Sequence, residues 1–221
     1  EMCIRDRYVD EGYTDVIHVP INRSGSSTYN NAVMAQGMLR EERPEHHLNI
    51  HLLDPHTYSM VFGWYLCEMA RKLQNGAELR HVISEFETQM NKMEVILGPY
   101  SLKQMKKSGR ISAAAAVMGE LMGIRPIITL IDGKTRVESK VRGDDKVIPA
   151  MIDLCKKRTE GVEDFDYMIG HTSIPQAAEL EKACRKAFGK APLTTFNLGG
   201  VVSANTGPDT LALVYVGKPR D

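Results

Sequence analysis

Short apolar runs alternate with amphipathic stretches from Gly12 onward, which is the pattern of an α/β protein. Apolar or alternating runs that stop at turn-forming residues predict strands at 16–19, 48–53, 93–98, 126–131, 135–141, 167–169 and 210–216. Apolar residues at helical spacing predict helices at 27–39, 60–73, 78–90, 111–122, 147–155 and 177–188. Strands and helices therefore alternate along most of the chain.

The order of these elements predicts two lobes. Before residue 90 the order is βαβα, which predicts a parallel sheet with helices packed on it. Farther along, Asp132-Gly133 separates two strands and predicts a hairpin, because this dipeptide suits the positive φ angles of a tight turn. We expect an N-terminal α/β lobe at 8–90 and a C-terminal α/β lobe with a mixed sheet at 91–221. Residues 1–7 show no periodicity, and we expect them to be an artefact outside the fold.

Composition narrows the classes of function. The 221 residues are 43% hydrophobic and 25% charged, which is typical of a globular protein with a sizeable core. Basic and acidic residues are equal at 28 each, so no net positive charge favours general binding to nucleic acid. No apolar run suits a membrane span or a signal peptide. The four cysteines are far apart without a C-x-x-C pair, which favours free thiols and a cytoplasmic location.

Motifs of common enzymes are not found in the sequence. A serine hydrolase would use a Gly-x-Ser-x-Gly segment, and none occurs. His47 and His51 are four residues apart in a predicted strand and could share a face. Their spacing suggests no third ligand, so surface histidines are favoured over a zinc site. We therefore predict no catalytic residue, no metal site and no cofactor.

Three polar segments are candidates for binding. The segment 22–29 is rich in hydroxyl groups, follows a strand and opens a helix, where backbone N–H groups and hydroxyls can hold a carboxylate or phosphate. A plain helix cap by Ser26 or Ser27 explains the same pattern equally well. Segments 106–112 and 140–143 each place Arg beside Gly, and strand alternation puts Lys140 and Arg142 on one face. Such a basic cluster is more often a solvated surface than a binding site.

Taken together in their order, these segments resemble the DegV family of fatty-acid-binding proteins, and the resemblance runs from about Gly12 to Gly217. The positions that carry it are 16–20, 22–29, Asp54 with Ser59 and Gly63, 107–112, 124–127, 132–133, 140–143 and 207–208. No single piece is decisive, but their joint order and spacing is far more specific than a lone glycine motif.

The resemblance implies a fold and a function. It implies a two-lobed fold, with a parallel-sheet α/β/α lobe, incomplete here, followed by a two-layer α/β lobe, and a fatty acid in a tunnel between the lobes. A separate fatty acid kinase would phosphorylate the held acid for phospholipid metabolism. The residues implied for the carboxylate are Asn22, Arg23, Ser24, Ser26, Thr28 and Asn205, with Ser24 and Ser26 as the best donors. The residues implied for kinase docking or phosphate neutralisation are Arg110, Lys140 and Arg142.

The chain departs from the family pattern in three places, and two of these, Asn205 and the missing N-terminal segment, leave an alternative open. The family commonly has Ser-Ser where this chain has Asn22-Arg23, and a histidine at the position of Asn205. An amide can donate a hydrogen bond but cannot carry the charge of an imidazolium. The N-terminal segment with which family members usually start, and which carries a Thr-Ser-Gln-Pro-Ser motif, is also missing, so we expect an N-terminally truncated fragment. The alternative function is a kinase-interacting regulatory adaptor that has lost lipid binding.

Overall fold

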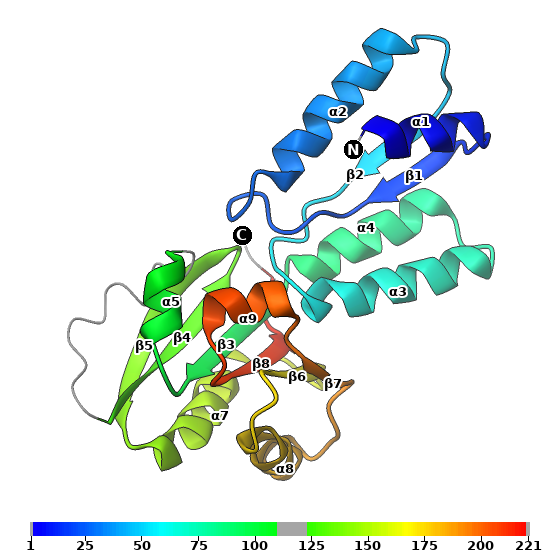
Figure 1. The fold of residues 1–221 in the computed structure, drawn as a ribbon. Coiled ribbons are helices and arrows are strands. Elements are labelled where there is room, and N and C mark those ends of the chain that lie inside the picture. The colour runs from blue at the N-terminus through cyan, green and yellow to red at the C-terminus, as the bar shows by residue number, and fades with distance from the viewer. Residues whose placement is uncertain (1, 110–122, 220–221) are drawn as a thin grey trace. The chain divides into compact units, whose positions relative to one another are not determined.

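A computed structural model describes residues 2–109 and 123–219 of the chain (Figure 1). The chain divides into two compact units, Glu1–Tyr58 and Ser59–Asp221. Each unit has its own sheet, one of two strands and one of six. This mixed α/β architecture confirms the predicted fold class, and the two units are described in turn.

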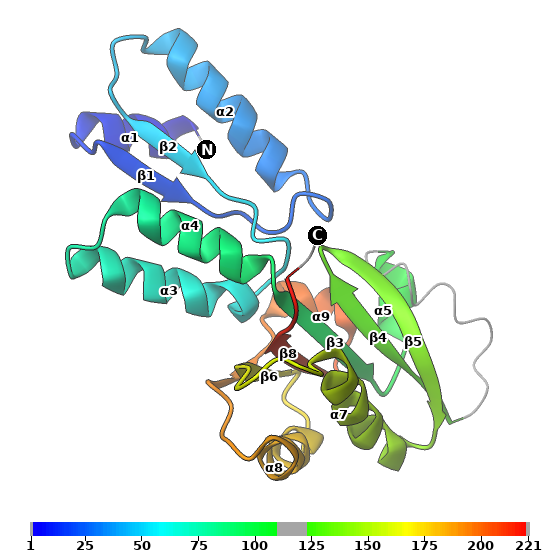
Figure 2. The ribbon, with the colours of Figure 1, turned by 180° about the vertical axis from the view of Figure 1, so that it is seen from behind.

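The first unit is a parallel strand pair with helices. Its elements are α1 (Met2–Asp10), β1 (Asp15–His18), α2 (Thr28–Glu42) and β2 (Asn49–Leu52). β1 and β2 run side by side in the same direction, with Asp15 opposite Asn49 and His18 opposite Leu52 (Figures 1 and 2). Parallel strands need a long crossover, and α2 provides it. The buried side of α2 consists of Ala32, Ala35 and Leu39.

The first helix differs from expectation. We predicted that residues 1–7 lie outside the fold, yet most of them belong to α1. The Arg5 side chain is only 4% exposed, and it bonds the His18 ring at 3.1 Å and donates to the Ala32 carbonyl at 3.4 Å. These contacts tie α1 to β1 and α2. Sequence periodicity missed the helix because its anchor is a buried charged residue rather than an apolar stripe.

The second unit has a six-stranded sheet with the order β5-β4-β3-β8-β6-β7. Its strands are β3 (Met93–Pro99), β4 (Ile124–Ile131), β5 (Lys134–Arg142), β6 (Tyr167–His171), β7 (Thr195–Asn197) and β8 (Thr210–Val216). β3 and β8 pair in antiparallel fashion at the centre, from Met93 opposite Val216 to Pro99 opposite Thr210. Among the described strands of this sheet, only β6 and β7 pair in parallel. Both central strands are buried along almost their whole length, which explains their unbroken apolar sequence.

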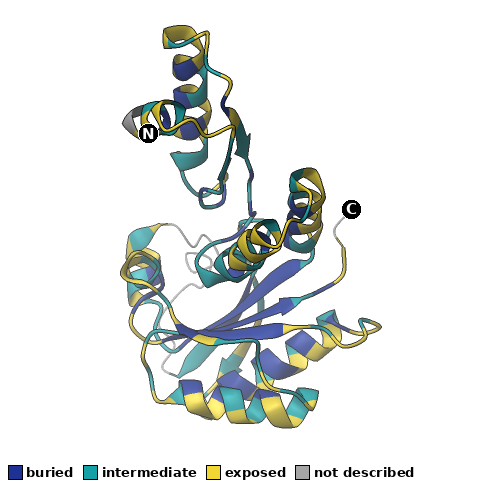
Figure 3. Cartoon of the chain, turned by 90° about the vertical axis from the view of Figure 1, so that its right-hand side faces the viewer, coloured by how far each residue is buried: buried dark blue, intermediate teal, exposed yellow. Residues whose placement is uncertain are grey.

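Helices cover both faces of this sheet (Figure 3). The helices are α3 (Met60–Gln74), α4 (Leu79–Met90), α5 (Lys103–Ser108), α7 (Val147–Arg158), α8 (Gln176–Phe188) and α9 (Gly200–Thr206), with a 3-10 turn at Asp144–Lys146. On one face, α7 and α8 form a core with the sheet that includes Ile96, Met151 and Leu180. Gly98 lets α7 come close, because a Cβ there would lie 2.4 Å from the Met151 sulfur.

The boundary between the units lies at Tyr58 and Ser59, whereas the sequence places it near residue 90. The sequence assigned α3 and α4 to the N-terminal lobe, whereas in the structure both helices belong to the second unit. These helices pack on each other, and α4 leads into the central strand β3 through Asn91 and Lys92 alone. Amphipathic spacing shows that a helix has a buried face but does not show which sheet the face covers.

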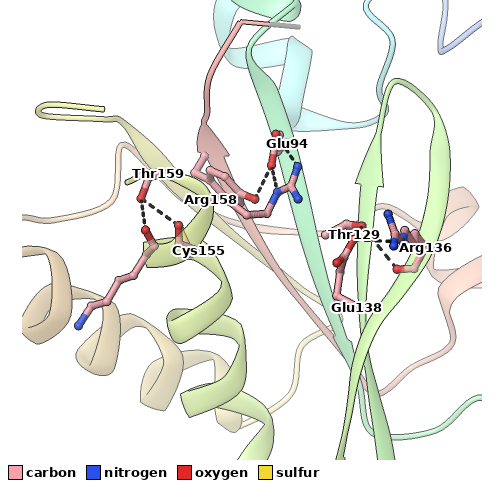
Figure 4. Close-up of polar contacts among 9 residues, drawn as sticks. Glu94, Thr129, Arg136, Glu138, Cys155, Arg158 and Thr159 are labelled. Carbon is pink, nitrogen blue, oxygen red and sulfur yellow. Dashed lines mark hydrogen bonds and ion pairs between the residues drawn. The ribbon is translucent and has the colours of Figure 1, made fainter. Parts of the chain in front are cut away.

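A charged group is buried beneath the end of α7 (Figure 4). The Glu94 carboxylate on β3 accepts two bonds from Arg158, at 2.5 and 3.0 Å, and a third from the Tyr215 hydroxyl at 2.6 Å. Burial, with Glu94 beside it, raises the pKa of Tyr215, and the hydrogen bond that Arg158 donates to Glu94 raises the pKa of Arg158. The three groups therefore satisfy one another in a site from which water is largely excluded.

The described ranges contain no helix that combines the length and apolar character needed to cross a membrane. The predicted helix at 111–122 lies outside the described residues.

Candidate functional site

The site is the turn between β1 and α2 in the first unit, which we call the hydroxyl turn and define as Asn22–Thr28. Asn22 anchors it, since this residue is 1% exposed and its N–H donates to the Thr57 carbonyl at 3.1 Å. The turn leads directly into α2, where the first bond typical of the helix runs from Asn31 N to the Ser27 carbonyl. The N–H groups before Asn31 have no acceptor within the helix, and the helix dipole makes this end attractive to an anion.

The Asn22 side chain organises the turn from inside. Its Oδ1 accepts both the Ser24 N–H at 3.1 Å and the Ser24 hydroxyl at 3.0 Å. Its Nδ2 donates to the Tyr58 hydroxyl oxygen at 3.2 Å. The Ser24 proton is therefore used within the turn, which makes Ser24 a poorer donor to a ligand than its sequence position suggests.

A second pair of hydroxyls stands at the start of α2. Ser26 Oγ and Thr28 Oγ1 are 2.8 Å apart, and the Thr28 N–H also donates to Ser26 Oγ at 3.3 Å. One proton joins the two hydroxyls, so the other hydroxyl proton is left to donate outward. Ser27 occupies the N-cap position, but its side chain makes no capping bond. Of the two serines considered as a plain helix cap, Ser27 therefore does not cap, whereas Ser26 Oγ accepts the Thr28 N–H at the first position of the helix.

The segment Asp54–Ser59 supports the turn from the end of β2. Asp54 Oδ1 accepts the N–H of Arg23 at 3.4 Å and that of His56 at 2.9 Å, and the Asp54 side chain is only 8% exposed. His56 and Ser59 have φ angles of 56° and 59°, which are strained for residues with a side chain. Asp54 is one of the positions that carry the family resemblance. No sequence pattern points to Tyr58, because a strained backbone path brings that residue to the turn.

The turn carries an ion pair, Arg23 with Asp54, and the arginine of this pair is exposed to solvent. The Arg23 guanidinium lies 4.0 Å from the Asp54 carboxylate and 5.3 Å from the centre of the Tyr29 ring. The Arg23 side chain is 62% exposed, so water weakens its attraction to Asp54 and leaves it able to approach another anion. Hydroxyls, helix N–H groups and one cation together suit a carboxylate or a phosphate oxygen.

The other predicted carboxylate residue lies in the second unit. Asn205 is in α9, and its Nδ2 donates to the Val201 carbonyl of the same helix at 2.8 Å. Its amide donor is therefore already used in part. The structure brings Asn22, Arg23, Ser24, Ser26 and Thr28 together in the first unit.

The predicted basic residues are on β5 of the second unit. Lys140 pairs with Pro126 and Arg142 with Ile124 across β4, and the residue between them, Val141, packs against the core beneath α7. Lys140 and Arg142 therefore point to the opposite face, as alternation predicts, and both are exposed. Arg110 lies outside the described residues.

His47 and His51, the histidine pair considered for zinc, have different surroundings in the structure. His51 Nε2 is 2.8 Å from Asp15 Oδ1, and this hydrogen bond lowers the pKa of Asp15. His47 lies before the start of β2 and is exposed. Among residues 2–109 and 123–219, no three His, Cys, Asp or Glu side chains are grouped so that they could hold a metal ion.

Comparison with known proteins identifies the family. The model of the DegV family, described as an uncharacterised protein family, matches residues 2–218. This chain belongs to the DegV family. A DegV domain-containing protein of Clostridium acetobutylicum is 27% identical over 202 residues, which are 91% of this chain and 70% of that protein.

Solved structures of DegV proteins share the fold. A stearic acid-binding protein from Eubacterium ventriosum superposes with a TM-score of 0.86 at 21% identity, covering 98% of this chain and 75% of that one. The fatty acid binding DegV family protein from Streptococcus agalactiae gives a TM-score of 0.82 at 25% identity, with coverages of 98% and 75%. The resemblance seen in the sequence is therefore confirmed at the level of family and fold.

Proposed function

We propose that this DegV protein binds a long-chain fatty acid, holds its carboxylate at the hydroxyl turn and presents it to a fatty acid kinase that forms the acyl-phosphate. The observation that carries the proposal is the Ser26–Thr28 pair, which has one hydroxyl proton to spare at the N-terminal end of α2. The fatty-acid binding of the two structural relatives supports the choice of anion. The protein supplies binding and orientation, and the kinase supplies the phosphoryl group.

The energetics of such a ligand require both a buried tail and a paired head group. Burying about 14 methylenes at ~0.8 kcal/mol each gives on the order of 11 kcal/mol before the costs of association and ordering. A carboxylate removed from water without partners would cancel much of this gain. The Ser26–Thr28 pair and the first N–H groups of α2 are the kind of donors that prevent this loss.

Native mass spectrometry tests the proposal. We expect the full chain, purified from a lipid-replete bacterial host, to carry the extra mass of a single fatty acid. Delipidated protein should then gain thermal stability on addition of stearate, because a ligand that binds only the folded state shifts the unfolding equilibrium. Protein that purifies empty and melts at the same temperature with and without stearate would contradict the proposal.

The exposed basic residues of β5 suit the kinase step rather than lipid binding. Replacing Arg142 with Ala is expected to leave stearate affinity within a few fold and to slow phosphorylation about tenfold or more, because an exposed arginine that docks the kinase or neutralises the phosphate acts on the transfer and not on the acyl chain. The measurement is the rate of acyl-phosphate formation with a fatty acid kinase. Arg136→Ala is the matched control, because Arg136 is an equally charged residue on the same strand and is 82% exposed. It lies away from Arg142 along β5, opposite Thr129, whose side chain donates to Glu138. Equal loss of affinity and rate in the Arg142 variant would contradict this division of roles.

A second candidate, the regulatory adaptor, is favoured by one observation. The amide donor of Asn205 is directed to the Val201 carbonyl, which weakens its predicted role at a carboxylate. An adaptor would bind the kinase without any lipid, whereas a carrier would present a loaded fatty acid. Measuring kinase binding with delipidated and stearate-loaded protein separates the two functions.

A further inference from the structure

We infer that the Tyr58 hydroxyl is an additional carboxylate-binding group that makes the hydroxyl turn selective for a fatty acid over the corresponding alcohol. This inference rests on the proposed function and adds a residue to it that the sequence analysis did not include. It depends on three features of the first unit: the free proton of Tyr58, the position of its ring against Gly25, and the rigid segment that holds it.

The Tyr58 hydroxyl has a proton to donate. A phenol can accept and donate at once, and the oxygen of Tyr58 accepts the Nδ2–H of Asn22 at 3.2 Å. Within residues 2–109 and 123–219, Tyr58 donates no hydrogen bond of its own. Asn22 is buried and its Oδ1 is fixed by two bonds from Ser24, so its Nδ2 is directed at Tyr58 in a set orientation. The bond from Asn22 therefore turns the phenolic proton away from Asn22.

The phenol is placed against the turn itself. A Cβ built on Gly25 would lie 1.8 Å from the Tyr58 hydroxyl oxygen, which means that the hydroxyl occupies the space a side chain would otherwise take. Gly25 is the neighbour of Ser26 in the chain, so the phenol meets the turn one residue before the Ser26–Thr28 pair. Glycine at this position is needed for close approach and not for its φ angle, because its φ is not in the left-handed region.

Tyr58 lies in a segment whose backbone is held under strain. His56 and Ser59 flank it with φ angles of 56° and 59°. Two contacts hold the segment to the turn, namely Asn22 N–H to the Thr57 carbonyl at 3.1 Å and Arg23 N–H to Asp54 Oδ1 at 3.4 Å. Within the segment, the His56 N–H donates to Asp54 Oδ1 at 2.9 Å. Strained residues persist where surrounding structure fixes them, and they are concentrated at binding and catalytic sites. A fixed phenol can donate to a ligand without a further ordering cost.

A hydrogen bond donated by Tyr58 to an ionised carboxylate predicts that the site prefers a fatty acid to the alcohol of the same chain length. A carboxylate gains more from a phenolic donor than an alcohol does, because hydrogen bonds to ionised acceptors are roughly twice as strong as neutral ones. The test compares stearate with octadecan-1-ol, which has the same chain length, in competition with a fluorescent acyl probe. Delipidated wild-type protein is expected to prefer stearate.

Tyr58→Phe is expected to weaken stearate about tenfold or more and to change octadecanol less than threefold. Gly25→Ala should also reduce the preference for stearate, because it displaces the phenol while the hydroxyl is retained. Tyr13→Phe is the matched control, since Tyr13 is 52% exposed in the same unit, and its affinities should equal those of wild type. Thermal melting of each variant shows whether it is folded.

Two results with the Tyr58 variant would overturn the inference while leaving the proposed function intact. In the first, stearate affinity is unchanged, so the phenol makes no contact with the head group. In the second, stearate and octadecanol weaken equally, so Tyr58 has only a structural role. Wild-type protein that binds no stearate would overturn the proposed function and this inference together.

Discussion

Replacing Ser26 with Ala and Thr28 with Val in one protein is expected to weaken stearate binding roughly 10- to 100-fold. The double change removes the outward hydroxyl proton of the pair and the acceptor that Ser26 offers to the Thr28 N–H. A hydrogen bond to a charged group contributes about 1.5–3 kcal/mol, and each ~1.4 kcal/mol is tenfold in affinity. Isothermal titration of delipidated protein with stearate measures the change.

Neighbouring serines provide matched controls for this result. Ser27 stands between the two replaced residues and makes no capping bond, so Ser27→Ala should alter affinity less than twofold. Ser24→Ala should have a smaller effect than the double change, because the Ser24 proton is used by Asn22. A double variant that binds stearate as wild type does would show that the carboxylate lies elsewhere.

The second large effect concerns stability. Glu94→Ala is expected to lower the free energy of unfolding by about 3–5 kcal/mol, because it leaves Arg158 and the Tyr215 hydroxyl without their shared acceptor in a mostly buried site. Urea unfolding followed by circular dichroism gives this value. The exposed pair of Arg71 with Glu68 is the contrast, since Glu68→Ala should cost less than about 1 kcal/mol. Equal destabilisation by the two changes would contradict the role assigned to burial.

Local sequence signals predicted much of the fold. The hairpin forms at Asp132-Gly133, whose φ angles of 49° and 70° are the positive pair that the dipeptide favours. The apolar runs at 93–98 and 210–216 became the central strands β3 and β8. Besides α1 and the 3-10 turn, three elements were not predicted, namely α5, β7 and α9. All three are short, so they contain too few residues for a period to show, and α9 begins with glycine and two β-branched valines, which are poor helix formers.

The candidate site was predictable in place but not in detail. Its position between a strand and a helix follows from the order of elements, because this junction exposes helix N–H groups. Which hydroxyl is free does not follow, since Ser24 and Ser26 look alike in sequence and differ only in the partners that Asn22 and Thr28 provide. Tyr58 reaches the turn through a backbone path with positive φ at His56, which no local pattern encodes.

Nuclear magnetic resonance tests most directly whether the hydroxyl turn holds a fatty-acid carboxylate. Protein labelled with ¹⁵N is titrated with stearate carrying ¹³C at the carboxyl carbon. We expect the amides of Thr28, Tyr29 and Asn30 to shift strongly with stearate and weakly with octadecanol. The bound carboxyl should stay ionised to a lower pH than that of free stearate, because donors stabilise its charged form. Saturating stearate that leaves these three amides unmoved would contradict the account.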